Sequence, residues 1–321
     1  MIKGHGDDAY HYAEGISSDF SSNICPHGSH QALMAHLASC GERLLAHYPE
    51  PEAWSLERLL AQYHDVAPGS VVVTNGATEA IYLVAQAFRL RPVIMGPTFS
   101  EYADACRQFP PTDSRHTVCW LCNPNNPTGQ VLDQHDVERL SARHQLLVID
   151  QSYEHYTDQF VWHPRWACRL PNVILLHSMT KTYGVPGLRL GYITAPVRLA
   201  NIIRQAMRPW AVSALAIEAG KFLLEHDDEL RCRPDLGEAQ RLWQQLNAIG
   251  GVSMQPTATN FMLGTVAHLT AAELKDRLAR QHGMLIRDAS NFRGLTPHHF
   301  RVAAQSPAEN DALVEALRGL A

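Results

Sequence analysis

The feature that most constrains the fold of this chain is a series of short apolar segments that begins at residue 70 and alternates with amphipathic ones. Five of these segments have the composition of β-strands: Ser70–Thr74, Pro92–Met95, Thr117–Cys122, Leu146–Asp150 and Val173–His177. Two of the segments between them, Ala77–Phe88 and Leu132–His144, have the character of helices. Nearly continuous apolar strands separated by helices are typical of a parallel sheet that is covered on both faces. We therefore predict an α/β fold for this part of the chain.

A different pattern follows Pro209. Longer helical segments and then three candidate strands are expected at Val212–Glu225, Pro234–Ile249, Asn260–Leu263, Met284–Arg287 and Phe300–Ala303. Capping-box spacing predicts helix starts at Thr270 and at Ser306, where Pro307 occupies the first helical position. The polar first 30 residues have the character of an arm that lies on another part of the protein. We predict an N-terminal arm (1–35), a large α/β domain (36–211) and a smaller α+β C-terminal domain (212–321).

Composition excludes several classes of protein. The 321 residues are 45% hydrophobic and 18% charged, which fits a packed chain of about two domains and excludes a disordered one. The formal charge of −5 favours neither a nucleic-acid surface nor an anionic-membrane surface. Seven scattered cysteines do not form a secreted disulfide framework, and we find neither a signal peptide nor an apolar run that could span a membrane. We expect a cytoplasmic protein.

The strongest local motif directly follows the apolar segment Val173–Leu176. It runs from Ser178 to Tyr192 with the pattern S-x-x-K-x-x-G-x-x-G-L-R-x-G-Y. A lysine at the end of a buried strand is costly unless it is used, and a partly desolvated lysine can form a Schiff base with an aldehyde. Ser178 and Arg189 flank Lys181 in this glycine-punctuated loop, where together they can bind one phosphate.

Three more polar motifs stand at strand ends. Asn75–Glu79 is a glycine turn into a helix N-terminus, which attracts anions through its dipole and its N–H groups. Asn123–Gly129 (N-P-N-N-P-T-G) is a rigid turn at the position where ligands bind in open α/β sheets. Asp150 ends an apolar strand, so its carboxylate needs a cation or a proton-sharing partner. Taken singly, each motif is also explained by an ordinary loop or a helix cap.

Together these strand ends supply an aldehyde-capturing lysine, a phosphate cup, a carboxylate and an amide, which are the groups that pyridoxal 5′-phosphate requires. The ordered set N-G-x-T-E, N-N-P-T-G, D-x-x-Y and the lysine motif resembles the fold-type-I pyridoxal-phosphate enzymes of the class I/II aminotransferase superfamily over nearly the whole chain. The resemblance implies an aspartate-aminotransferase-like large domain with a mainly parallel sheet, plus a smaller α+β C-terminal domain.

The resemblance also implies roles for individual residues. Lys181 matches the lysine that forms the Schiff base with the cofactor, and Asp150 matches the carboxylate that keeps the pyridinium nitrogen protonated. Tyr153 and Asn126 match the groups that hydrogen-bond the ring O3′. The cofactor phosphate and ring are expected to contact the backbone amides of Ala77 and Thr78, the side chains of Ser178 and Arg189, and the stacked ring of Phe99.

Further matches concern a second subunit and the substrate. Tyr48 resembles the tyrosine that reaches the cofactor phosphate of the neighbouring subunit, which implies a homodimer with shared active sites. Arg301 resembles the arginine that grips the substrate α-carboxylate as a bidentate pair. No metal site is expected, because the C-x-x-C of Cys119 and Cys122 has no second pair at zinc-like spacing, and an offset of three on a strand directs the two thiols to opposite faces.

Two subgroups of the superfamily are similar to this chain: the threonine-phosphate decarboxylases of cobalamin synthesis and the histidinol-phosphate aminotransferases. Segments 4–6, 19–26, 208–216 and 286–295 resemble motifs of the decarboxylases and favour a small phosphorylated amino acid as substrate. The aminotransferase remains the alternative. Substrate contacts are expected from His5, Asn23, Arg287 and Arg301. Arg293 is a further candidate for a substrate phosphate and is also explained as a solvated surface residue.

Several positions depart from the family pattern. Asp7 replaces a glycine of the opening motif, and Ser213 stands where asparagine is expected. Gln151 and His177 occupy positions that are often Glu and Arg in the family. The stretch between residues 102 and 123 is shortened, with loss of helix and strand material.

The sequence disfavours two other functions. The S-x-x-K of Ser178 and Lys181 has the form of the acylation motif of penicillin-binding proteins, but the required S-D-N and K-T-G tripeptides do not occur. A degenerate member that only binds ligand is disfavoured by the intact Lys181 and Asp150.

Overall fold

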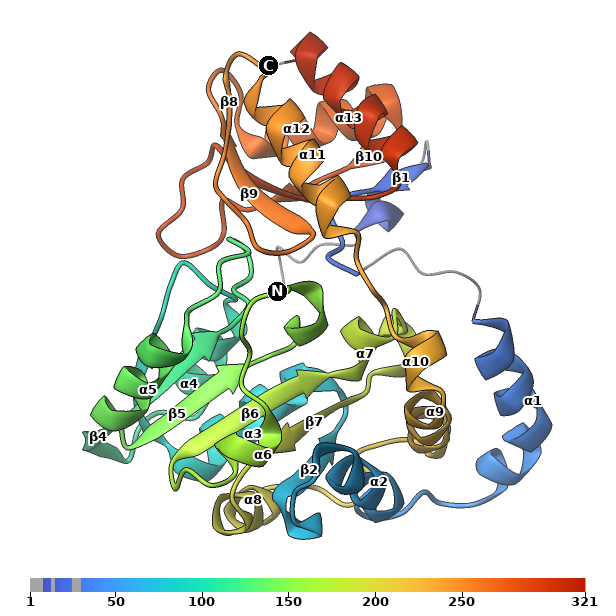
Figure 1. Cartoon of the computed structure of the whole chain (residues 1–321), viewed down its shortest axis with the longest axis vertical. Helices are drawn as coiled ribbons and strands as arrows, with labels where there is room; N and C mark the ends of the chain where they lie inside the picture. The colour runs from blue at the N-terminus through green and yellow to red at the C-terminus, as the bar shows by residue number, and fades with distance from the viewer. Residues whose placement is uncertain (1–7, 13–14, 25–29, 321) are drawn as a thin grey trace.

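The computed structural model describes residues 8–12, 15–24 and 30–320, whose strands form sheets of six, four and two strands (Figure 1). The strands are β1 (Ser18–Asp19), β2 (Val71–Thr74), β3 (Leu90–Ile94), β4 (Asp113–Cys122), β5 (Leu146–Asp150), β6 (Val173–Ser178), β7 (Gly191–Thr194), β8 (Val252–Met254), β9 (Phe261–Val266), β10 (Met284–Leu285), β11 (Arg287–Asp288) and β12 (His299–Ala303). The helices are α1 (Gln31–Ala46), α2 (Trp54–His64), α3 (Gly76–Phe88), α4 (Glu101–Gln108), α5 (Gln134–Arg143), α6 (Pro164–Ala167), α7 (Met179–Thr182), α8 (Val197–Arg204), α9 (Ala214–Glu225), α10 (Asp227–Leu230), α11 (Leu236–Asn247), α12 (Ala271–His282) and α13 (Pro307–Leu320).

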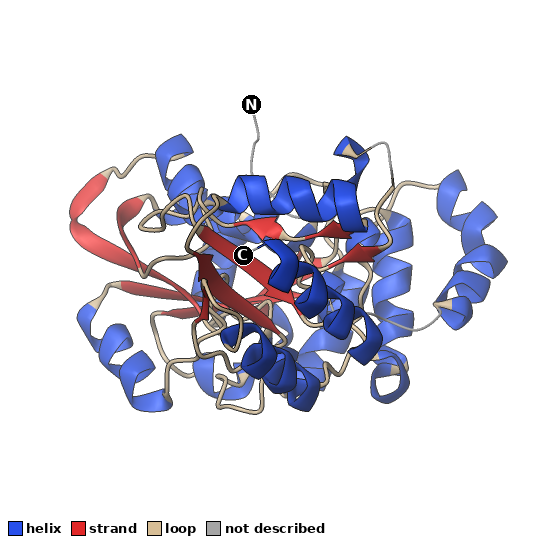
Figure 2. Ribbon diagram, turned by 90° about the horizontal axis from the view of Figure 1, so that it is seen from above, coloured by secondary structure: helices blue, strands red, loops and turns tan. Residues whose placement is uncertain are grey.

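The six-stranded sheet has the order β2-β7-β6-β5-β4-β3 and is mostly parallel. Strands β3 to β6 run parallel, whereas β7 is antiparallel to both of its neighbours, β2 and β6. Helices cover both faces: Val72 packs with α3, α4 and α8, while Val71 and Val73 pack with α2 and α9. In Figure 2 helices lie on either side of the central strands, and strand segments extend to the left edge of the view. Because both faces of these strands are buried, β2, β5 and β6 are apolar except near their C-terminal ends, and the predicted α/β fold is confirmed.

The five predicted apolar strands are confirmed as β2 to β6, with ends shifted by a few residues. Strand β7 was not predicted, because it begins at Gly191 inside the glycine-punctuated motif. A Cβ at Gly191 would lie 2.7 Å from the backbone nitrogen of Ala77, so close packing against the start of α3 requires glycine there. Cys119 and Cys122 point to opposite faces of β4, as predicted: Cys119 packs with α5 and α6, and Cys122 packs on the face of α3 and α4.

The small unit, at the top of Figure 1, is an antiparallel sheet of order β11-β12-β9-β8 with α11, α12 and α13 on one face. Phe300 and Val302 of β12 point into the apolar core beneath these helices. The capping box of Thr270 at the start of α12 is confirmed. Ser306 exchanges hydrogen bonds with Glu309, and α13 begins at Pro307, so the second predicted helix start is confirmed as well.

The prediction of one continuous strand at Met284–Arg287 is wrong. β10 pairs in parallel with β1 near the N-terminus, whereas β11 pairs with β12. Phe20, next to β1, extends the contact: its N–H donates to Leu285 and its carbonyl accepts from the N–H of Ala303. The chain therefore changes partner at Ile286, and the partner of β10 comes from the opposite end of the sequence, where no local pattern indicates it.

The region noted as shortened passes from α4 to β4 through residues 109–112. β3 is therefore an edge strand of the sheet, and Pro92 on β3 fits an edge, where one side of the strand needs no hydrogen-bond partner. Within the described ranges no helix is long and apolar enough to cross a membrane. The domain boundaries at 35/36 and 211/212 remain a prediction.

Candidate active site

A cavity of about 340 Å³ is lined by residues of the large sheet's strand ends, of the small unit and of the N-terminal segment 21–24. Twelve of the fifteen residues that the sequence nominated line this cavity: Asn23, Ala77, Thr78, Phe99, Asn126, Asp150, Tyr153, Ser178, Lys181, Arg189, Arg287 and Arg301. The three exceptions are His5, which lies outside the described residues, Tyr48 and Arg293. The fold thus gathers side chains that are up to 278 residues apart in the sequence, from Asn23 to Arg301.

Asp150 lies at the end of β5 and is 4% exposed. Its Oδ2 accepts a 2.8 Å hydrogen bond from the Tyr102 hydroxyl, and its Oδ1 accepts a 2.9 Å bond from the N–H of Ser152. Burial, reinforced by the Asp150 charge, raises the pKa of Tyr102 well above its usual value, so the hydroxyl stays a donor. No arginine or lysine of the described chain forms an ion pair with Asp150. A cationic group in the cavity would supply the missing counter-charge.

One end of the cavity has the properties of an anion site. The hydroxyls of Ser178 and Thr180 lie 2.7 Å apart, beside Arg189 and the first turn of α3. Gly76 has φ +83°, and a Cβ there would lie 2.7 Å from Nη2 of Arg189, so only glycine allows the guanidinium to approach the helix start. The N–H groups of Ala77 and Thr78 in this turn have no acceptor within the helix. Hydroxyls, a guanidinium and a helix N-terminus together suit a phosphate.

Lys181 follows β6 on the short helix α7, and its Nζ lies 5.8 Å from the centre of the Tyr153 ring. Its backbone carbonyl accepts a 2.9 Å hydrogen bond from the Tyr156 hydroxyl, which fixes α7 against the segment after β5. The Tyr153 hydroxyl accepts a 3.2 Å bond from Nδ2 of Asn23. Burial raises the pKa of Tyr153 to about 12, so its hydroxyl is protonated at neutral pH and can donate into the cavity.

Two arginines from the small unit face the cavity. Arg287 and Arg301 are direct neighbours on the antiparallel strands β11 and β12, and each is 5% exposed. Because Phe300 and Val302 point into the helix-covered core, the period of two along a strand directs Arg301 to the opposite face. Burial lowers the pKa of Arg287 and lowers the pKa of Arg301 to about 10. Two desolvated cations side by side form a strong site for anions.

The Arg301 guanidinium is held by two contacts, which use two of its five N–H donors. Nη1 donates to Oδ1 of Asn126 at 2.6 Å, and Nη2 donates to the carbonyl of Ser21. The buried Nε of Arg301 and the buried Oδ1 of Asn23 have no partner in the described part of the chain. Unsatisfied buried polar atoms are rare in folded proteins and indicate a ligand at this position.

Sequence reasoning missed several residues that line the cavity: Ser21, Ser22, Ile24, Ile81, Ser100, Tyr102, Cys122, Ser152, Thr180, Pro186, Asn291 and Phe292. Most of them lie within or beside motifs that had been identified, such as Thr180 in the lysine motif and Asn291 in segment 286–295. Asn291 accepts a 2.9 Å hydrogen bond from Arg287. The motifs therefore indicated the correct segments of the chain, but their spacing did not show which of their side chains point into the cavity.

The unusual residues Gln151 and His177 meet in a buried network directly behind Asp150 and Ser178. His177 Nδ1 lies 2.9 Å from one carboxylate oxygen of Glu154, and Nε2 of Gln151 donates to the other at 3.2 Å. His64 stacks on His177 with ring centres 5.6 Å apart. Burial would raise the pKa of Glu154, but His177 outweighs it and the pKa falls to about 2. Both altered positions thus contact a single carboxylate.

Three other residues noted in the sequence lie away from the cavity. Tyr48 is 86% exposed, and its ring lies 5.4 Å from that of Trp210. Arg293 is exposed and does not line the cavity, as expected for a surface residue. Ser213 is the N-cap of α9, where its hydroxyl accepts a 3.1 Å bond from the N–H of Ala216. A cap role explains this departure, because serine caps a helix as well as asparagine does.

Comparison with known proteins gives consistent matches. The model of the family "Aminotransferase class I and II" matches residues 95–317. The threonine-phosphate decarboxylase of Salmonella typhimurium is 30% identical over 94% of this chain and 90% of its own length. The histidinol-phosphate aminotransferase of Caldanaerobacter subterraneus is 28% identical over 84% of this chain and 83% of its own. Among solved structures, the L-threonine-O-3-phosphate decarboxylase of Porphyromonas gingivalis matches with a TM-score of 0.89 and 38% identity, covering 94% of this chain and 98% of that one.

Proposed function

The chain belongs to the class I and II aminotransferase family, and within it we propose a threonine-phosphate decarboxylase that converts L-threonine O-3-phosphate to aminopropanol phosphate for cobalamin synthesis. The cofactor is pyridoxal 5′-phosphate. The proposal adds a substrate and a reaction to the family assignment. It is supported by the 38% identity to the decarboxylase of Porphyromonas gingivalis.

The observation that carries the proposal is the buried pair Arg287 and Arg301. Threonine phosphate bears two anionic groups, a carboxylate and a phosphate, a few bonds apart. Two adjacent arginines, each 5% exposed, match this charge pattern within one cavity. Histidinol phosphate bears a phosphate but no carboxylate, so it offers only one anionic group to the two arginines.

The groups around the cavity fit the cofactor. Asp150 has no cationic partner in the described chain, and a protonated pyridine nitrogen would supply one. The hydroxyl pair of Ser178 and Thr180, with Arg189 and the start of α3, fits the cofactor phosphate. We assign Lys181 to the aldehyde carbon, Tyr153 and Asn126 to the ring oxygen, and Phe99 to the ring face.

In this proposal the chain's own residues select the bond that breaks. Arg301, with Asn23 beside it, would bind the substrate carboxylate through bidentate hydrogen bonds and set its orientation in the cavity. When bound, the cofactor would supply an electron sink for the electron pair of the bond between Cα and the carboxylate. Carbon dioxide departs, and a proton takes its place on Cα. We assign Lys181 Nζ as the donor of that proton, and Arg287 with Asn291 as the holder of the substrate phosphate.

The second candidate function is histidinol-phosphate aminotransferase. It is favoured by the 28% identity to the Caldanaerobacter enzyme over most of both chains. In that reaction Lys181 would remove the Cα proton of the substrate and return it at another carbon as a general acid–base catalyst. Both reactions use the same lysine and the same cofactor groups. The distinction therefore depends on which bond of Cα the residues of this cavity orient for cleavage, the bond to the carboxylate or the bond to hydrogen.

We also propose that the protein is a cytoplasmic homodimer with shared active sites. Tyr48 and Trp210 form an exposed aromatic pair, with 86% and 50% of their surfaces accessible. Such aromatic rings are often covered by a partner. A second copy that covers them would bring the Tyr48 hydroxyl to a neighbouring cofactor phosphate.

Product analysis tests the proposal. The purified protein, loaded with cofactor, is offered O-phospho-L-threonine alone and, separately, histidinol phosphate with 2-oxoglutarate. If the protein is a decarboxylase, the first mixture should yield carbon dioxide and an amino-alcohol phosphate without a keto acid. Glutamate formation from the second mixture, without carbon dioxide from the first, would refute it in favour of the aminotransferase.

A further inference from the structure

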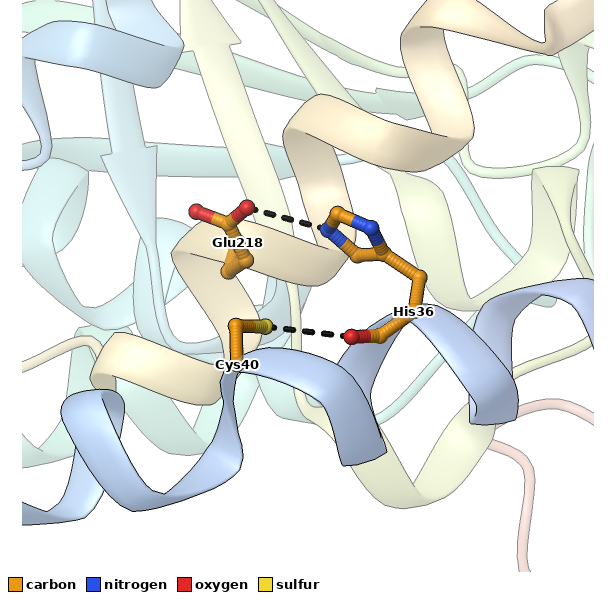
Figure 3. A group of neighbouring side chains, drawn as sticks. All are labelled: His36, Cys40 and Glu218. Atoms are coloured by element: carbon orange, nitrogen blue, oxygen red, sulfur yellow. Dashed lines mark hydrogen bonds and ion pairs between the residues drawn. The ribbon is translucent and has the colours of Figure 1, made fainter.

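Three side chains of types that can ligate a metal lie together between helices α1 and α9 (Figure 3). None of the three lines the cavity. His36 and Cys40 belong to α1, and Glu218 belongs to α9. One ligand atom of each residue lies within 4.8 Å of the others. The separation of 182 residues between His36 and Glu218 explains why no sequence spacing predicted a site.

The geometry of α1 places two soft ligands on one helix face. His36 and Cys40 are four residues apart, so their side chains lie one turn from each other, and both are half-buried. The thiol of Cys40 donates to the carbonyl of His36 at 3.2 Å, which keeps the sulfur beside the imidazole. The His36 ring stacks on Phe222 with centres 4.5 Å apart, which fixes the orientation of its Nε2.

Glu218 is oriented by a second contact. Lys221 holds its Oε2 at 2.6 Å, while its Oε1 faces His36 Nε2 at 3.0 Å. The contacts with Lys221 and His36 hold the Glu218 carboxylate in place, and a carboxylate oxygen is a ligand that zinc accepts. Such support from outside the ligand set is typical of built metal sites.

We propose that His36, Cys40 and Glu218 bind one zinc ion, with water at the fourth position. In a tetrahedral site with bonds of roughly 2.0 to 2.3 Å, ligand atoms lie about 3.3 to 3.7 Å apart. The His36 and Glu218 atoms are 3.0 Å apart, and all three ligand atoms lie within 4.8 Å of one another. Small side-chain rotations would therefore bring the three atoms to the separations of a tetrahedral site. Binding releases the Cys40 proton. The thiolate and the carboxylate then balance the two charges of the metal.

The ion would act as a structural clamp for α1. In this 16-residue helix Leu33 is fully buried and Leu37 packs at the edge of the same apolar core, whereas most of the other side chains are exposed or half-buried. It follows the segment 21–24 that lines the cavity, and it precedes Tyr48. A bond network from α1 to α9 would therefore fix both flanking segments relative to the large sheet. This inference does not depend on which reaction the site catalyses.

Cobalt titration tests the proposal. The cofactor-loaded protein is treated with a chelator, dialysed and titrated with Co²⁺, whose bond to a thiolate gives a charge-transfer absorption. We expect the band to saturate at one equivalent, and added Zn²⁺ to abolish it. Zn²⁺ should also raise the thermal midpoint of the wild-type protein.

Matched variants decide the outcome. Cys40→Ser should abolish the band, and His36→Gln should weaken Co²⁺ binding by more than about tenfold. Cys168→Ser is the control, because Cys168 is also a half-buried free thiol but lies outside the cluster. Circular dichroism and cofactor binding verify that each variant folds. A wild-type protein without the band, or a Cys40→Ser variant that keeps it, would overturn the proposal.

Discussion

Replacing His64 by Gln should make the protein less sensitive to acid. His64 lies in the buried network behind the cavity, with its Nε2 2.7 Å from the Tyr192 hydroxyl and its ring stacked on His177. Burial, followed by repulsion from His177, lowers the pKa of His64 to about 3. Glutamine retains a polar group that can reach Tyr192 but cannot take up a proton.

The direction and the size of the expected change in the free energy of unfolding follow from proton linkage. In the unfolded chain His64 takes up its proton near pH 6.5, whereas in the folded protein it stays neutral down to about pH 3. Acidification through this window therefore favours the unfolded state, and folding stability falls as the pH falls. At pH 5, which is 1.5 units below the unfolded value, the loss from His64 alone is about 2 kcal/mol, at roughly 1.4 kcal/mol per unit. At pH 8 it is close to zero.

Denaturant unfolding followed by fluorescence at pH 8 and pH 5 measures this difference. The wild-type protein should lose about 2 kcal/mol more than the His64→Gln variant between the two pH values. Any constant cost of the substitution cancels, because it is present at both pH values. His268→Gln, at an exposed position, is the control and should lose as much as the wild type. Equal losses in wild type and His64→Gln would show that His64 titrates normally in the fold and would refute the argument.

Three further predictions concern other positions. Arg301→Lys cannot form the bidentate pair, and kcat/KM for O-phospho-threonine should fall roughly a hundredfold; an unchanged value removes Arg301 from the carboxylate. Gly129→Ala places a Cβ 1.9 Å from Thr257 Oγ1 at φ +69°, so urea unfolding should show a loss of about 2 kcal/mol or more, whereas Gly250→Ala, with open space, should be nearly neutral. Tyr48→Phe should weaken cofactor binding about tenfold, as measured by absorbance titration, and equal affinity would contradict its role across a dimer interface.

Much of the candidate site could be predicted because its chemical groups lie at the ends of strands. Apolar segments of four to six residues identify β2, β5 and β6; Asn75 directly follows β2, and Asp150 and Ser178 are the last residues of β5 and β6. Neighbouring parallel strands end at the same edge of a sheet. Local order in the sequence was therefore enough to bring the lysine, the carboxylate and the phosphate groups together.

The remaining features depend on contacts between segments that are far apart in the sequence. Such contacts produce no periodic pattern of residues. The split of Met284–Arg287 into β10 and β11 follows from pairing with Ser18–Asp19, and the network of Gln151, His177 and His64 exists only because three elements pack together. Local propensity contains no information on such partners.

The sequence by itself determined the α/β class, the strand ends and the chemical groups available there, because periodicity and strand-end residues are local properties. Only the tertiary structure decided that Arg287 and Arg301 stand side by side, that Asn23 reaches Tyr153, and that α1 brings His36 to Glu218. These contacts arise from burial and sheet register, which act on the whole chain at once. A side chain at the end of a strand acquires its chemical surroundings only when distant segments exclude water from it.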